Sequence, residues 1–216
     1  FESDSIVEAV SRLTSGQVTA FGAATTGAGV VYLVLFAPPA VWLLTAASWT
    51  VYVWMYTPLK ARSAWQTPLG AAAGAMPTLI GAAAAGATPL GLMPLILFGI
   101  VFFWQFPHAM AIAWLYRADF AAARLKVASV VDPSGRTAAR LSLIGAAALL
   151  PVSVAPCLDG RVGWRYAAAA LAFGLGYLAC AAAFARHAVD ARARLLLWGS
   201  LAYLPAICAA LVFAIW

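Results

Sequence analysis

The chain has 216 residues, of which 65% are hydrophobic and 9% are charged, and its formal net charge is +6. Soluble domains carry about 25% charged residues, so this composition excludes a soluble protein. It predicts an all-α, polytopic membrane bundle with the lipid bilayer as its surroundings. The positive charge follows membrane topology, as described below, and we therefore expect no nucleic-acid partner.

Seven apolar segments follow one another along the chain, and each is long enough for a membrane crossing of about 20 residues. They are 18–37, 39–56, 68–86, 90–116, 140–157, 166–185 and 195–216. No internal repeat or linker divides them, so we expect one domain over residues 1–216. The polar stretch 1–17 lacks the basic-then-apolar order of a signal peptide.

Positively charged residues gather between alternate segments. If the N-terminal tail is cytoplasmic, that side carries Arg12, Lys60, Arg62, Arg117, Arg124, Lys126, Arg136, Arg140, Arg186, Arg192 and Arg194. The other side carries Arg161 and Arg165. Because cytoplasmic loops are enriched in Lys and Arg, we expect a multi-pass protein of a bacterial-type cell membrane, with its polar chemistry on the cytoplasmic side.

Two of the cytoplasmic pieces carry small charged sets. In the N-terminal tail, the carboxylates of Glu2, Asp4 and Glu8 could coordinate a hard cation such as Mg²⁺, or the tail could simply be solvated. After the second segment, Lys60 and Arg62 could anchor the helix at the membrane surface or clamp a phosphate group. Spacing alone leaves both pairs of alternatives open.

Two other stretches predict structure rather than chemistry. In the segment 68–86, Gly70, Gly74 and Gly81 predict close helix contact, because residues without a side chain let membrane helices approach each other. The tract 130–136, VVDPSGR, predicts a turn before the next segment.

The stretch from Phe102 to Phe120 places polar residues inside an apolar segment. Gln105 and His108 share one side of the predicted helix, and Pro107 between them predicts a kink. Polar groups at membrane depth are costly and usually face a cavity or a partner. His108 could therefore hydrogen-bond a neighbouring helix or bind a ligand, and the stretch predicts a site that opens toward one membrane face.

The loop 117–140 is longer than a membrane hairpin needs. Its first charged residues are Arg117, Asp119, Arg124 and Lys126. Asp119 lies eleven residues after His108, close to three helical turns, so a continued helix would place both on one face. The charged set could hold a metal–diphosphate group, or the loop could be an ordinary hydrated one.

The stretches 56–81 and 102–123 resemble motifs of one known family. YTPLKARSAWQTPLGAAAGAMPTLIG is similar to a YT–LKR stretch followed by GA–GA–P–IG, and FFWQFPHAMAIAWLYRADFAAA is similar to a W–PH helix leading to a charged R–D-[YF] loop. Residues 11–19, SRLTSGQVT, resemble the end of the family's first cytoplasmic loop. Because the order of these motifs agrees, the chain resembles the UbiA-type intramembrane prenyltransferases, and within them the protoheme IX farnesyltransferases.

The resemblance implies a helical bundle around a cavity that opens to the cytoplasmic side. In this family two acidic loops and Mg²⁺ bind a prenyl diphosphate. The implied reaction is transfer of a farnesyl group from farnesyl diphosphate to the vinyl group of haem B, which gives haem O. Haem B is then a substrate rather than a cofactor, and a haem A synthase is the downstream partner that the resemblance suggests.

The resemblance also assigns roles to residues. The catalytic residues, which would act on the diphosphate, are Lys60, Arg62 and Asp119. The substrate contacts, with His108 on the haem side, are Tyr56, Gln105, His108, Arg117 and Lys126. The metal ligands are Asp119, Asp4 and Glu2.

The sequence departs from the family in several places. The family has nine spans, so residues 1–216 would be an N-terminally incomplete domain without the first two spans. The first acidic loop keeps only Glu2 and Asp4. In the second loop, Arg124 stands near an expected Gly, and VAS at 127–129 replaces a Met-Leu-Pro-like run.

Two other functions are compatible with these departures. One is a catalytically degenerate homologue that binds haem or lipid. The other is a UbiA-type prenyltransferase with a different aromatic or tetrapyrrole acceptor.

Overall fold

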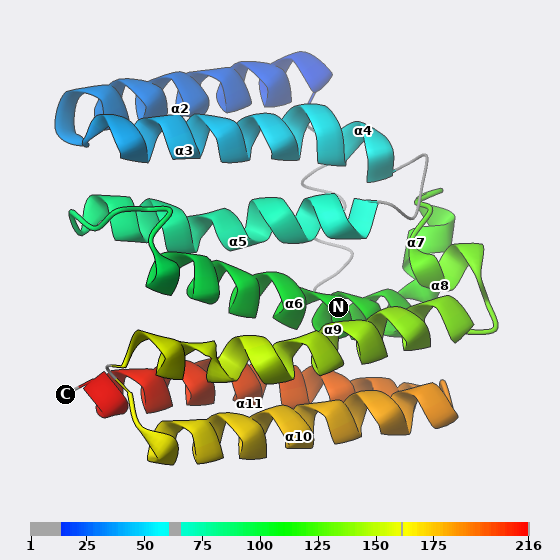
Figure 1. The fold of residues 1–216 in the computed structure, drawn as a ribbon. Helices are drawn as coiled ribbons and strands as arrows, with labels where there is room; N and C mark the ends of the chain where they lie inside the picture. The colour runs from blue at the N-terminus through cyan, green and yellow to red at the C-terminus, as the bar shows by residue number, and fades with distance from the viewer. Residues whose placement is uncertain (1–13, 61–65, 161, 216) are drawn as a thin grey trace.

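The structure, a computed structural model of the chain, describes residues 14–60, 66–160 and 162–215, and these residues form helices without any strand (Figure 1). The long helices are α2 (Ser15–Phe36), α3 (Pro39–Thr50), α5 (Gln66–Ala84), α6 (Leu92–Leu115), α9 (Arg136–Val154), α10 (Trp164–Arg186) and α11 (Asp190–Ile215). The short ones are η1 (Val51–Tyr56), α4 (Thr57–Lys60), α7 (Arg117–Ala122), α8 (Ala128–Val131) and η2 (Ala155–Asp159). The predicted all-α bundle is confirmed.

Within the described residues, five helices are long and apolar enough to cross a membrane. They are Ser15–Phe36, Leu92–Leu115, Arg136–Asp159, Trp164–Arg186 and Asp190–Ala214. The two other predicted segments are also helical, as α3 with η1 and as α5. The first is divided between α- and π-helix, and the second is rich in Gly and Ala. The seven membrane crossings predicted from the sequence are therefore a looser estimate than the five helices that are long and apolar enough to cross.

The helix that begins at Pro39 continues without a break through a π-helical turn. Thr50, Val51 and Thr57 all have right-handed helical backbone angles, so α3, η1 and α4 form one rod. The hydroxyl of Thr57 donates to the carbonyl of Tyr52 at 2.8 Å within this turn. π-Turns of this kind often occur at functional sites. Here the turn carries two tyrosines, Tyr52 and Tyr56, whose ring centroids are 5.1 Å apart.

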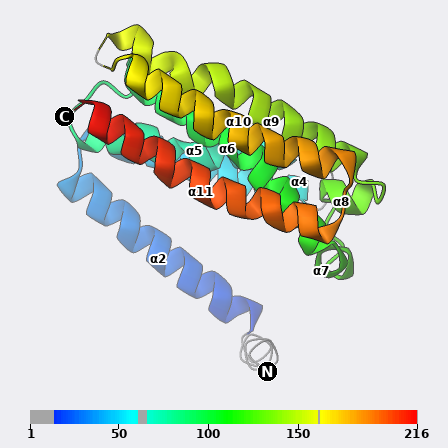
Figure 2. The same ribbon diagram turned by 90° about the horizontal axis from the view of Figure 1, so that it is seen from below.

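Helix α6 packs against α5 on one side and against α9 and α11 on the other. Pro107 has no N–H, so the carbonyl of Phe103 lacks its usual helical partner. Helix α9 packs directly against this point, because a Cβ on Gly145 would lie 2.6 Å from Phe106 Cβ and 2.9 Å from Phe103 O. A glycine at this position therefore lets α9 cover the site of the predicted kink. By contrast, α2 has no buried residue and lies away from α11 (Figure 2).

Most charged residues of the described part of the chain lie at one end of the bundle, which we call the charged end. It contains α4, α7 and α8, the starts of α5, α9 and α11, and the end of α10 (Figure 1). Its described charged side chains are Arg117, Asp119, Arg124, Lys126, Asp132, Arg136, Arg140, Arg186, Asp190, Arg192 and Arg194. Asp159 and Arg165 lie at the opposite end. The basic segments predicted to share one side of the membrane thus meet at the charged end of the folded bundle.

The tract from Val130 to Arg136 forms the predicted turn. Asp132 accepts hydrogen bonds from the backbone and hydroxyl of Ser134 and from the backbone and hydroxyl of Thr137, the latter two at 2.8 Å. Gly135 follows with a φ of 76°, and a Cβ there would lie 2.7 Å from both Trp114 and Ala188. The turn therefore starts α9 and holds the charged end against α6 and α10.

We expect Asp132→Asn to lower the melting temperature at pH 7, measured in detergent. The four hydrogen bonds hold the pKa of Asp132 below its ordinary value. A lowered pKa means that the stabilisation is complete above the unfolded-state pKa of about 3.9 and is lost as the pH falls through the folded-state pKa. The difference from wild type should therefore shrink below about pH 4. Ser134→Ala should give a smaller loss at pH 7, and a difference independent of pH would contradict this account.

Candidate functional site

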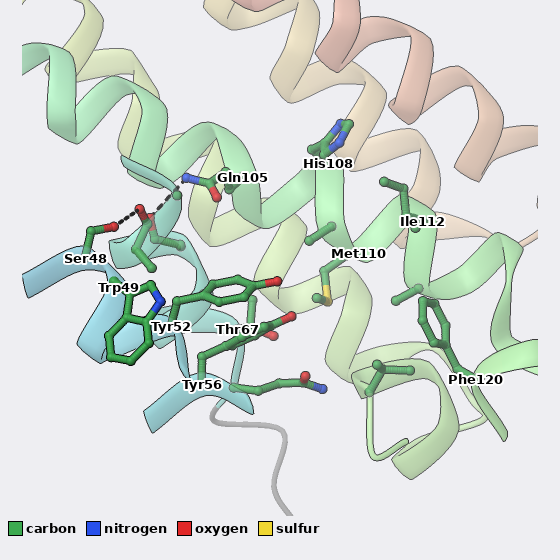
Figure 3. A pocket seen from close by; sticks show the side chains of 18 of the residues that line it. Ser48, Trp49, Tyr52, Tyr56, Thr67, Gln105, His108, Met110, Ile112 and Phe120 are labelled. Atoms are coloured by element: carbon green, nitrogen blue, oxygen red, sulfur yellow. Dashed lines mark hydrogen bonds between the residues drawn. The ribbon is translucent and has the colours of Figure 1, made fainter. Parts of the chain in front are cut away.

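A cavity of about 650 Å³ lies between α3, η1, α5, α6 and the segment that follows α6 (Figure 3). Most of its lining is apolar. Its polar lining residues include Ser48, Tyr52, Tyr56, Gln66, Gln105 and His108. Ligand pockets typically enclose about 300–1,000 Å³ and combine apolar walls with a few fixed polar groups. The cavity is therefore large enough for a drug-sized ligand and contains the Gln and His that the sequence singled out.

Aromatic side chains form one wall of the cavity. Trp49, Tyr52 and Tyr56 lie on the same side of it in Figure 3. The ring of Tyr56 rests on Gly70 of α5, where a Cβ would lie only 2.8 Å from the ring. Gly70 thus leaves the space that Tyr56 occupies. The wall offers π-faces, which attract cations by about 0.5–2 kcal/mol depending on desolvation.

Gln105 joins α6 to α5 across the cavity wall. Its amide nitrogen donates to the carbonyls of Ala71 and Val101, both at 3.1 Å. A Cβ on Gly74 would lie 2.2 Å from Gln105 Oε1, so Gly74 leaves room for this carboxamide. The close contact predicted for Gly70 and Gly74 is therefore present. It is absent at Gly81, where an added Cβ would meet no atom of the described residues within 4 Å.

His108 is held by two neighbours on the side of α6 that faces α11. Its Nδ1 lies 2.8 Å from the hydroxyl of Ser200, and its ring stacks on Trp104 with centroids 4.6 Å apart. In Figure 3 the ring points away from Tyr52 and Tyr56, although His108 is among the lining residues. His108 thus makes one of the two predicted interactions, a hydrogen bond to a neighbouring helix, through its Nδ1. The other nitrogen leaves a ligand role open.

The charged loop reaches the cavity at two places. Phe120 and Val127 line the cavity, and the exposed residues Asp119 and Lys126 are their neighbours in sequence. The side chain of Gln66, 4% exposed, donates to the carbonyl of Lys126 at 3.2 Å and fixes the end of the loop to the start of α5. Gln66 was not among the residues predicted for the site. The sequence shows only a Gln at the start of a helix, and this feature is too common to predict a contact with the loop.

Arg117 has a different neighbourhood from Asp119. Its guanidinium donates to Asp190 at 2.8 Å and to the carbonyl of Trp114 at 2.7 Å, and it lies 4.8 Å above the Trp114 ring. The indole N–H of Trp114 also donates to Asp190, at 3.1 Å. Arg117 is not among the described residues that line the cavity. Its contacts join the start of α7 to the start of α11.

The continued helix that would place His108 and Asp119 on one face does not form. Helix α6 ends at Leu115, Tyr116 departs from helical angles with φ −104° and ψ 25°, and α7 begins at Arg117. The predicted alignment of His108 and Asp119 on one face of a continued helix is therefore wrong.

Some predicted site residues cannot be placed. Glu2, Asp4 and Arg62 lie outside the described residues, and so does the side chain of Lys60, whose backbone ends α4. Of the predicted metal ligands, Asp119 alone belongs to the described part of the chain. Within that part, no three residues of the His, Cys, Asp and Glu types cluster in a way that could hold a metal ion.

Arg124 has a backbone conformation that suits glycine. Its φ is 55°, in the left-handed region that costs a residue with a side chain about 1–2 kcal/mol. Arg124 stands near a position where the family resemblance predicts Gly. The structure gives that expectation a physical reason, because α7 ends here and the chain turns toward α8.

A comparison with protein families now bears on this site. The model of the UbiA prenyltransferase family matches residues 8–201, which include every described lining residue of the cavity. The chain belongs to the UbiA prenyltransferase family. The resemblance inferred from the motifs is confirmed.

Individual UbiA-family relatives agree with this membership. The chain is 43% identical to a protoheme IX farnesyltransferase of Solibacter usitatus over 91% of its length and 67% of the relative's, and 40% identical to that of Opitutus terrae over 93% and 68%. It is 33% identical to the mitochondrial protoheme IX farnesyltransferase of Arabidopsis thaliana over 78% of its length and 39% of the relative's. The chain thus spans about two thirds of the first two relatives. No solved structure matches it significantly.

We expect Arg124→Gly to raise the free energy of unfolding by about 1 kcal/mol, because glycine adopts a positive φ without the steric cost of a Cβ. Chemical denaturation in detergent measures this change. Arg124→Ala, which keeps the Cβ, serves as the matched control and should give no such gain. Equal stability of the Gly and Ala variants would show that the backbone is not strained at this position.

We expect Gly74→Ala to displace the Gln105 amide and so to cost about 1 kcal/mol of the free energy of unfolding, through the lost hydrogen bond to Ala71. In a Gln105→Ala background the same change should cost nothing, giving a coupling energy of about 1 kcal/mol. Gly81→Ala, on the same helix in open space, should be neutral or stabilising. A Gly74→Ala effect that is the same in both backgrounds would refute the contact.

Proposed function

We propose that this chain transfers a farnesyl group from farnesyl diphosphate to the vinyl group of haem B, and so forms haem O. The observation that carries this proposal is the cavity of about 650 Å³ in a UbiA-family bundle, apolar and aromatic inside and lined in part by Phe120 and Val127 of the charged end. The names of the relatives supply the substrates, since each of those reported above is a protoheme IX farnesyltransferase.

The two parts of the prenyl substrate match the two parts of the cavity. The apolar lining suits the farnesyl chain, while Asp119 and Lys126, the neighbours in sequence of the lining residues Phe120 and Val127, are the proposed contacts of the diphosphate. Lys60 and Arg62, on the segment between α4 and α5, are the proposed further cations for the diphosphate. Fixed charges aimed at a leaving group stabilise the charge that develops on it.

The proposed metal is Mg²⁺, held by carboxylates. Asp119 is exposed and provides the hard oxygen ligand that Mg²⁺ prefers. Asp4 and Glu2 are the other proposed ligands. When bound, Mg²⁺ neutralises charge on the departing diphosphate.

The reaction breaks the bond between C1 of the farnesyl group and the diphosphate oxygen, and the diphosphate leaves with the bonding electrons. The allylic cation that remains would lie against the aromatic wall of Trp49, Tyr52 and Tyr56, which stabilises it and limits the access of water. The vinyl π-electrons of haem B form the new carbon–carbon bond. Water then adds to the other vinyl carbon and releases a proton, which gives the hydroxyethylfarnesyl group.

The charged end is the proposed cytoplasmic side. Of the described residues, most Lys and Arg lie at this end, in agreement with the enrichment of these residues in cytoplasmic loops. Farnesyl diphosphate would then enter from the cytoplasm, and its apolar chain would pass into the membrane part of the bundle. A haem A synthase is the proposed consumer of the product.

Incubation of membranes that contain the complete, folded chain with haem B, farnesyl diphosphate and Mg²⁺ tests the proposal. Chromatography with mass detection should find haem O, and removal of Mg²⁺ with a chelator should stop its formation. Asp119→Asn should lower the rate on the order of 100-fold, the effect of losing one electrostatic contact to the reacting group. Asp159→Asn, at the opposite end of the bundle, is the matched control and should leave the rate unchanged.

Absence of haem O from the folded chain would overturn the proposal. Prenylation of an aromatic acid or of another tetrapyrrole in place of haem B would assign a different acceptor to the same site. Equal rates for wild type and Asp119→Asn would refute the role of the second loop.

A further inference from the structure

Helix α7 carries the acidic residue of the charged loop, but it has little packing of its own. It is six residues long, none of them is buried, and its N-cap residue Tyr116 makes no side-chain cap hydrogen bond. Isolated helices shorter than about 12 residues are marginal in water. The orientation of α7, and with it the direction of Asp119, therefore depends on the few contacts that join α7 to the rest of the bundle.

The first residue of α7 is held by a carbonyl, a carboxylate and a ring. Arg117 Nη1 donates to the carbonyl of Trp114 at 2.7 Å and to Asp190 Oδ1 at 2.8 Å, and the guanidinium lies 4.8 Å above the Trp114 ring. The indole N–H of Trp114 donates to the same Asp190 oxygen at 3.1 Å. Asp190 thus fixes both the guanidinium and the ring on which the guanidinium stacks.

Trp114 is a rigid base for this arrangement. It is buried, its ring meets Phe184 of α10 edge-on with centroids 5.8 Å apart, and a Cβ on Gly135 would lie 2.7 Å from it. Asp190 belongs to the first turn of α11. The start of α7 is therefore anchored to α6, α10 and α11, long helices that bury apolar surface against one another.

We propose that Asp190 is a positioning residue, which holds Arg117 so that α7 presents Asp119 to the prenyl diphosphate. The inference rests on the proposed function for the identity of that ligand. Phe120 follows Arg117 by three residues in α7 and lines the cavity, so a rotation of α7 about its start would also move part of the cavity wall. Arg117 then acts through its anchor and not through contact with the substrate.

The ion pair matters more for the direction of α7 than for the stability of the bundle. The side chains of Arg117 and Asp190 are 41% and 47% exposed. Exposed ion pairs contribute little to the free energy of unfolding, because water screens the charges and two flexible side chains must be ordered. Loss of the pair should therefore leave the bundle folded and release α7.

A direct contact between Arg117 and the diphosphate is the alternative, and it is the role that the family resemblance implies. The two roles differ in their dependence on Asp190. If Arg117 binds the substrate directly, its loss costs the same with or without Asp190. If Arg117 acts through Asp190, the second substitution costs little further, because residues that act as one unit are not additive.

Hydrogen exchange without substrate and transferase kinetics, both on the complete, folded chain in detergent, test the proposal. In Asp190→Ala, the amides of α7 should exchange about tenfold faster than in wild type, while those of α9 and the melting temperature stay unchanged. The KM for farnesyl diphosphate should rise about tenfold with little change in kcat. Arg117→Ala and the double variant should match Asp190→Ala. Asp190→Glu, which keeps the carboxylate, should restore slow exchange.

Arg194→Ala is the matched control. Arg194 is an exposed charged residue on α11, four residues after Asp190, so its loss should change neither the exchange of α7 nor the KM. Asp190→Asn keeps the size of the side chain, removes its charge and provides the same test where Asp190→Ala does not fold. Unchanged exchange of α7 in a folded Asp190 variant, or full additivity of the Arg117 and Asp190 substitutions, would overturn the proposal.

The outcome can be separated from that of the proposed function. Faster exchange of α7 in Asp190→Ala of a chain that forms no haem O would support the anchor and refute the proposed function. Haem O formation with the same KM in wild type and folded Asp190→Ala would refute the positioning role and leave the transferase activity standing.

Discussion

The need to pair polar groups at membrane depth shapes this structure around α6. Lipid offers no hydrogen-bond partners, so each polar group there must find one within the protein or face a cavity. Gln105 finds the backbone of α5, and His108 finds Ser200 of α11. Phe103 O, left free by Pro107, is covered by the close approach of Gly145 on α9. One helix is thus joined to three neighbours by the few polar groups that it carries.

The glycines of the bundle follow from the same requirement. Gly70 and Gly74 lie where Tyr56 and Gln105 reach α5, so the absent side chains form the space in which the cavity's polar and aromatic groups are held. The sequence predicted close contact for three glycines, and two of them have it. The third, Gly81, could not be separated from them because the face of a helix that meets a neighbour depends on the packing of the whole bundle.

The fold class was predictable from composition and from the length of the apolar segments, and so was a cavity lined by Gln105 and His108. The identities of their partners were not. Ser200 lies 92 residues after His108, and Asp190 lies 73 residues after Arg117. Such pairs depend on which helices become neighbours in the fold. A single serine or aspartate in the sequence does not indicate which helix it will contact. The helix break at Tyr116 was likewise missed, since no Pro or Gly in the 102–120 stretch stands there to end the helix.

Helix α11 contributes to both ends of the candidate site. Asp190, in its first turn, pairs with Arg117 beside the charged loop, while Ser200 bonds His108 at the level of the cavity. Ten residues of one helix separate them, a rise of about 15 Å. The separation between the charged loop and the His108 ring is therefore set by one rigid segment, independently of the cavity wall that α3 and α5 provide.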